Sequence, residues 1–252
     1  MSKMSALAQQ GYGLLIALGI KVLEALALWI VGRWLIGLSV RLISKAMTKQ
    51  KIDPTLIRYI NNTVAAILNI VLVVAILASA IGVFVASSLV HMVLKWHNSD
   101  YRKLPDEEAA RAVLRSTTPG MYFIPHCPDM KEMQKPENIQ KFVDGPVAMI
   151  TIRPAGKPSM GAPLLQWFIL NLFVSAIAGY IATKMVYPGA SFLAICRPTS
   201  AVTFMSYAAG SLSAGIWYGR TWSAVTKEVL DAVIYAVVAA CIFAWLWPAM
   251  PA

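Results

Sequence analysis

Charged residues are scarce in this sequence. Only 13% of its 252 residues are Asp, Glu, Lys or Arg, whereas 58% are hydrophobic, and the mean hydropathy is +0.62. Soluble globular domains are about one-quarter charged. The shortage of charge therefore excludes an ordinary soluble domain and indicates a membrane protein.

Cysteine and long basic runs are scarce as well. The three cysteines are too few for a disulfide framework, although a pairing of Cys127 with Cys196 stays open. No run of Lys and Arg exceeds two residues, so the net charge of +10 does not predict a nucleic-acid partner. Glycine-rich phosphate loops are also absent from the sequence.

The few charges are concentrated in one segment. Residues 95–162 hold 18 of the 34 charged residues and 8 of the 14 prolines. Strongly apolar sequence lies on both sides of this segment, which is the pattern of a multi-pass membrane protein. We therefore divide the chain into an apolar part (1–94), a polar extramembrane segment (95–162) and a second apolar part (163–252).

Five stretches are long and apolar enough to be read as membrane spans. The expected fold is an all-α polytopic membrane protein with a small mixed α/β segment between the second and third spans. In that segment the sequence predicts a short helix to about residue 115 and strands at 121–124 and 147–153, forming a small hairpin with one helix. The five expected spans are 12–40, 64–94, 163–186, 199–218 and 229–247.

Five basic residues and one acid, Asp53, separate the first two spans, which predicts a cytoplasmic hairpin and an external N-terminus.

The second span has two interpretations. A single long helix over 64–94 places residues 95–162 outside, and its 31 residues are too few for two full spans. A helical hairpin broken near residues 79–82 places them inside, which their basic flanks favour.

Four blocks in the N-terminal third carry a family resemblance. They are GIKVL (19–23), WIVGRWLI (29–36), IDPTLIRYI (52–60) and NIVLVVAIL (69–77). In this order and spacing they resemble the first two transmembrane helices of bacterial small-conductance mechanosensitive channels.

That resemblance implies a lipid-facing paddle that tilts under membrane tension, beside a third helix that lines a heptameric pore. Residues 1–94 would then form a two-helix membrane paddle, with 19–40 and 60–77 as its tension-sensing surfaces. The residues expected to contact lipid headgroups are Arg33, Arg41, Lys45, Lys49, Lys51 and Arg58.

The sequence departs from the family after Leu77. It continues apolar into His91 and Lys95, without the loop and the regularly patterned Gly/Ala pore helix that the family has next. Residues from about 84 onwards resemble a second family of bacterial membrane proteins without a known function. The pore helix is therefore not identifiable from the sequence.

Two groups of residues could supply metal ligands. His91, Lys95 and His97 lie at the end of the second span, and His126, Cys127 and Asp129 lie in a proline-bounded turn. These side chains suit zinc or copper, but no ligand pair has a recognised spacing. Adjacent His126 and Cys127 also make a poor catalytic pair.

The acids near the start of the last span, Glu228 and Asp231, are interpreted as suiting a helix N-terminus. We therefore expect no catalytic residues, no cofactor and no bound metal, and we expect that the protein is not an enzyme.

The sequence thus predicts a mechanosensitive-channel-type protein of the bacterial inner membrane. Its expected partners are membrane lipids and further copies of itself. The alternatives are a non-conducting scaffold or partner-binding protein, with 199–218 as its packing face, and a metal-dependent membrane enzyme.

Overall fold

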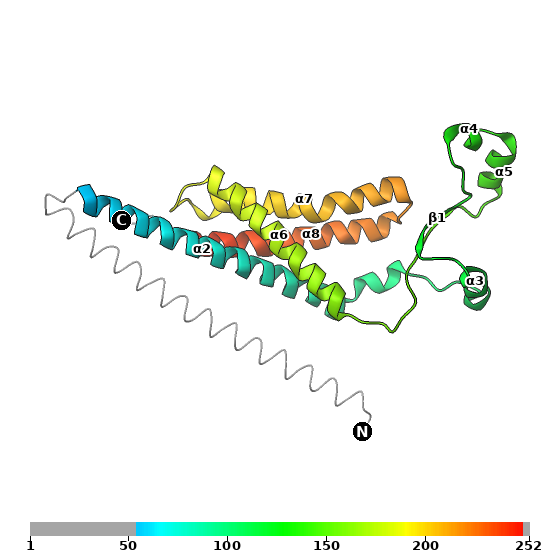
Figure 1. Cartoon of the computed structure of the whole chain (residues 1–252), viewed down its shortest axis with the longest axis horizontal. Coiled ribbons are helices and arrows are strands. Elements are labelled where there is room, and N and C mark those ends of the chain that lie inside the picture. Colours follow the sequence, from blue (N-terminus) through cyan, green and yellow to red (C-terminus); the bar gives the residue numbers. More distant parts are fainter. Residues whose placement is uncertain (1–53, 249–252) are drawn as a thin grey trace, which may run out of the picture. The chain divides into compact units, whose positions relative to one another are not determined.

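The computed structural model describes residues 54–248; residues 1–53 and 249–252 lie outside the described part. Residues Asn69–Pro248 form one compact unit. In chain order the elements are α2 (Pro54–Leu89), η1 (Val90–Leu94), η2 (Trp96–Asp100), α3 (Glu107–Leu114), β1 (Gly120–Ile124), α4 (Met130–Met133), α5 (Pro136–Asp144), β2 (Ala148–Ile152), α6 (Gly161–Met185), α7 (Phe192–Tyr218) and α8 (Trp222–Leu246). Figure 1 labels helices α2 to α8 and strand β1.

Helix α2 is a single helix of 36 residues. It begins at Pro54, as expected for a proline in the first turn. The helix passes through residues 79–82 without a break, so the single-helix interpretation is confirmed and the hairpin is wrong. It continues into the π-helical turn η1, and the left-handed backbone of Lys95 (φ 53°) then ends it.

Two faces of α2 differ in side-chain size. One face keeps bulky apolar side chains exposed, namely Ile70, Val73, Val74, Leu77, Ile81, Val85 and Leu89. The other buries smaller side chains, and with Val90 of η1 this row comprises Ala75, Ser79, Ala80, Val83, Ser87 and Val90. Both rows follow the three- and four-residue spacing of a helix face. Helix α2 therefore packs through small side chains and leaves its large apolar ones facing outward.

Helices α6, α7 and α8 pack through small residues. Helix α7 lies alongside both α6 and α8 (Figure 1). At Gly179 of α6, a Cβ atom would lie 3.1 Å from Ile76 Cγ1 of α2 and 3.2 Å from Phe243 Cε1 of α8. Small residues allow helices in membranes to approach closely and gain van der Waals contact. Gly179 thus marks the point where α2, α6 and α8 meet.

Hydrogen bonds between buried polar side chains also join these helices. The Ser175 hydroxyl of α6 donates to Ser79 Oγ of α2 at 3.2 Å. The Tyr207 hydroxyl of α7 donates to Asn171 Oδ1 of α6 at 2.6 Å, and Asn171 is fully buried. Such pairs satisfy polar groups that would otherwise lie unpaired in an apolar environment.

The polar segment contains the expected strands but more helices than predicted. Strands β1 and β2 pair antiparallel, with Tyr122 opposite Ile150. Helix α3 begins after Asp106, whose carboxylate accepts the Ala109 N–H at 2.9 Å as an N-cap. The expectation of one helix was wrong, because α4 and α5 lie in the connection between the two strands.

Three described helical stretches are long and apolar enough to cross a membrane: Ala66–Leu94, Gly161–Met185 and Trp222–Leu246. They correspond to three of the five expected spans. The expected span over 12–40 lies outside the described residues. The fourth, at 199–218, lies within α7, which begins earlier, at Phe192, and continues through Pro198. Residues 192–197 were expected in a loop and are helical instead.

Candidate functional site

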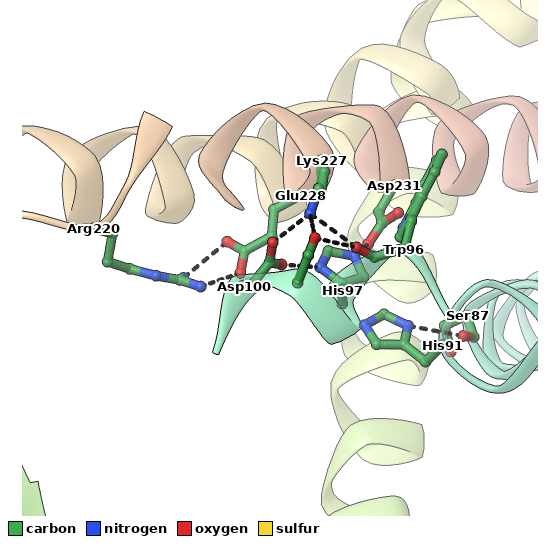
Figure 2. A network of polar contacts seen from close by, with 10 residues as sticks. Ser87, His91, Trp96, His97, Asp100, Arg220, Lys227, Glu228 and Asp231 are labelled. Atoms are coloured by element: carbon green, nitrogen blue, oxygen red, sulfur yellow. Dashed lines mark hydrogen bonds and ion pairs between the residues drawn. The ribbon is translucent and has the colours of Figure 1, made fainter. Parts of the chain in front are cut away.

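The candidate site lies where the chain leaves α2 and meets the first turns of α8. After the left-handed turn at Lys95, the short 3-10 helix η2 lies against α8. Four side chains from these two elements join them: His97 and Asp100 of η2, and Lys227 and Asp231 of α8. We call these four residues the polar latch (Figure 2).

His97 is the centre of the polar latch. Its Nδ1 lies 2.7 Å from Asp100 Oδ2, and its Nε2 lies 2.8 Å from Asp231 Oδ2. Only 15% of the His97 side chain is exposed, and the carboxylates are 7% and 5% exposed. A single imidazole thus links two nearly buried carboxylates, one from each element.

Lys227 makes the other connection between α8 and η2. Its Nζ donates to Asp100 Oδ1 at 2.5 Å, to Ser99 Oγ at 2.8 Å and to the Trp96 carbonyl at 2.8 Å. The hydrogen bond from Lys227, with a further one from His97, lowers the pKa of the Asp100 carboxyl, although burial acts in the opposite direction. Asp100 is therefore ionised at neutral pH and faces two donors.

His91 extends the site towards α2. Its ring is stacked on that of His97, with centroids 4.8 Å apart and planes 8° from parallel. Its Nδ1 lies 2.9 Å from the Ser87 carbonyl oxygen, and the Ser87 hydroxyl accepts a hydrogen bond from Trp167 Nε1 at 2.8 Å. The His91 ring is thus held by the carbonyl of Ser87, a residue one helical turn earlier in the chain.

Two buried polar atoms in the site have no hydrogen-bond partner among the described residues. They are Trp96 Nε1 and Asp231 Oδ1. The indole of Trp96 lies beside the Asp231 carboxylate (Figure 2), so its N–H is a candidate donor to that carboxylate. Native structures leave few buried polar atoms unsatisfied. Asp231 Oδ1 is therefore a buried acceptor without a hydrogen bond, and the Trp96 N–H beside it is a buried donor without one.

Arg220 and Glu228 form a separate ion pair at the edge of the site. Both guanidinium NH groups reach the carboxylate, and the longer of the two bonds is 2.9 Å. The Arg220 side chain is 39% exposed, so solvent screens this pair. It contributes less than the buried contacts of the polar latch.

The structure brings together some of the residues that the sequence singled out. His91 and His97 are neighbours, and among the described residues they form a group with Asp231 whose donor atoms all lie within 4.8 Å of one another. The turn at 125–129 contributes nothing to that group. There, His126 lines a shallow hollow beside the strands, and Asp129 caps α4 by accepting the Glu132 N–H at 2.9 Å.

The sequence interpretation missed Asp100, Lys227 and Asp231. Asp231 was taken as an acid that suits a helix N-terminus, but it lies more than two turns inside the apolar helix α8. An acid at that depth in a candidate span is itself the signal of a specific partner. The expected headgroup contacts lie outside the described residues except Arg58, which lies in the second turn of α2.

Comparison of this chain with protein families, with curated proteins and with solved structures found no match.

Proposed function

We propose that the protein is a tension-responsive membrane protein of the mechanosensitive-channel type, in which α2 transmits bilayer forces to the helices that follow it. The observation that carries this proposal is the continuity of α2 through the region of family resemblance to the polar latch. A helix of 36 residues is about 54 Å long, which exceeds a hydrocarbon core of roughly 30 Å.

The exposed face of α2 supports a role in contact with lipid. Its row of bulky apolar side chains lies opposite the small side chains that pack inward. Lipid is the solvent that such a face fits. Tension can act only on a difference in lipid contact between two states, so a helix with a large free apolar face is a suitable sensor.

The polar latch adds a polar connection to the direct packing of α2 against α8, in which Val83 contacts Tyr235 and Ala239. A force on α2 reaches α8 only through groups that join them, and the contacts of η2 with Lys227 and Asp231 do so next to the end of α2. These contacts are short and nearly buried. A movement of α2 is therefore expected to move α8 as well, because the segment between them is fixed to α8 by these contacts.

Suction on membrane patches tests this proposal. The full chain is reconstituted in liposomes, and its insertion is verified by labelling Cys127 with an impermeant thiol reagent after Cys196 and Cys241 have been replaced by serine. We expect currents that appear with suction and that protein-free patches lack. Inserted protein that stays silent up to the lytic tension contradicts the conducting form of the proposal.

A second candidate, a non-conducting scaffold, is favoured by one observation on α7. Gly210 is exposed, and a Cβ atom added there would meet nothing within 4 Å. Ser206 and Ser213 are exposed nearby, which leaves room for a helix of another protein to approach closely. Silent patches together with a fixed heterologous partner crosslinked at residue 210 support this candidate, whereas a ring of identical subunits counts against it.

A further inference from the structure

We propose that His91, His97 and Asp231 form a binding site for a divalent transition-metal ion, with zinc as the ion it fits. The three residues come from η1, η2 and α8, and one donor atom of each lies within 4.8 Å of the others. Two imidazole nitrogens and one carboxylate oxygen are a donor set that zinc takes in proteins. The sequence alone led to the expectation of no bound metal.

In both histidines one ring nitrogen has the kind of partner that metal-binding histidines have. His91 Nδ1 is bonded to the Ser87 carbonyl at 2.9 Å, and His97 Nδ1 to the Asp100 carboxylate at 2.7 Å. Histidines that bind metals almost always donate their second ring N–H to a carbonyl or carboxylate, which fixes the ring and its tautomer. Both Nε2 atoms are thereby left for the ion.

Asp231 provides the third ligand and the independent sign of a missing partner. Its side chain is only 5% exposed, and its Oδ1 has no hydrogen-bond partner among the described residues. Oδ2 lies 2.8 Å from His97 Nε2. An ion between these two groups replaces the hydrogen bond, and its positive charge compensates that of the buried Asp231 carboxylate.

The contact of His97 with Asp231 is already close to the geometry of a site. Two ligands at about 2.0–2.1 Å from one tetrahedral ion are about 3.3 Å apart. His97 Nε2 and Asp231 Oδ2 must therefore separate by only about half an ångström from their 2.8 Å contact. The hydrogen bond from Lys227 holds Asp100 in place during this movement. Asp100 therefore continues to accept the hydrogen bond from His97 Nδ1.

His91 must move further. Its ring is stacked parallel to that of His97, whereas two imidazoles on one ion direct their nitrogens to a common point. His91 is exposed and lies in the π-helical turn η1, so its side chain can rotate away from its stacking on His97. Turns of this kind are frequent at functional sites. Three protein ligands also leave a fourth position open for water or another donor.

Zinc titration of the purified full chain tests the proposal. The protein is stripped with a chelator, and Zn²⁺ is then titrated in competition with a chromophoric chelator. We expect one zinc per chain. His91→Ala is expected to weaken binding about 100-fold or more, because loss of an outer partner alone costs roughly 10–100-fold. This variant removes the ring stacked on His97 but none of the hydrogen bonds that join the four residues of the polar latch, so we expect it to fold as the wild type does.

His126→Ala is the matched control, because the chain has three histidines and this one lies outside the group. We expect it to keep wild-type affinity and stoichiometry. Absence of stoichiometric zinc from the wild type overturns the proposal. So does a His91→Ala variant that binds as tightly as the wild type, or a His126→Ala variant that loses the site.

Discussion

Lys227→Met is expected to lower the free energy of unfolding by about 2 kcal/mol or more. The substitution keeps the length and apolar stem of the side chain but removes the ammonium. Asp100, Ser99 and the Trp96 carbonyl then lose their common donor. Because Asp100 is 7% exposed and Lys227 only 19% exposed, water replaces the lost hydrogen bonds poorly. The effect is measured by thermal or denaturant unfolding in one detergent, followed by tryptophan fluorescence.

Lys184→Met is the matched control for this substitution. Lys184 also lies at the end of a candidate span but is exposed, and its ammonium lies over the Tyr180 ring at 5.5 Å from the centroid. Exposed substitutions of this kind change stability by about 0.5 kcal/mol or less. If the two variants unfold alike, the contacts of Lys227 do not stabilise the junction.

Gly179→Leu is expected to destabilise the packing of α2, α6 and α8 by about 1–3 kcal/mol. The added Cβ atom alone would lie 3.1 Å from Ile76 Cγ1 and 3.2 Å from the ring of Phe243, and Phe243 is fully buried. Leucine adds three further carbons beyond that Cβ. The helices must separate to accept them, which removes van der Waals contact along their length. The same unfolding assay measures this loss.

Gly210→Leu is the matched control. It makes the same substitution in helix α7, at a position without the steric conflict. A Cβ at Gly210 meets nothing within 4 Å, and leucine is the better helix former. We expect this variant to be as stable as the wild type or slightly more stable. A Gly179→Leu variant that matches it would show that α2, α6 and α8 do not approach as closely as the structure places them.

Much of the helical framework follows from the sequence, because it depends on local signals. The charge-free run over 64–94 predicts a long helix, and α2 covers most of it before η1 completes it. The acids after Pro105 predict the short helix α3, and the alternation at 147–153 predicts β2. Each of these predictions depends on residues within about two turns of one another.

The candidate site depends on contacts that no local pattern shows. His97 and Asp231 are 134 positions apart, and nothing in the sequence says that η2 meets α8. Their meeting depends on the left-handed turn at Lys95, an uncommon conformation for a residue that is not glycine. Asp231 carried the usable signal, since an acid inside an apolar helix needs a partner.

The central claim is that the polar latch joins the end of α2 to α8. A double-mutant cycle with Asp100→Asn, Lys227→Met and the double variant tests it most directly, with unfolding free energies measured in one detergent. The account predicts a coupling energy of at least about 1.5 kcal/mol between the two residues, as for close and poorly solvated charge pairs. Strictly additive effects, with a coupling near zero, would contradict it.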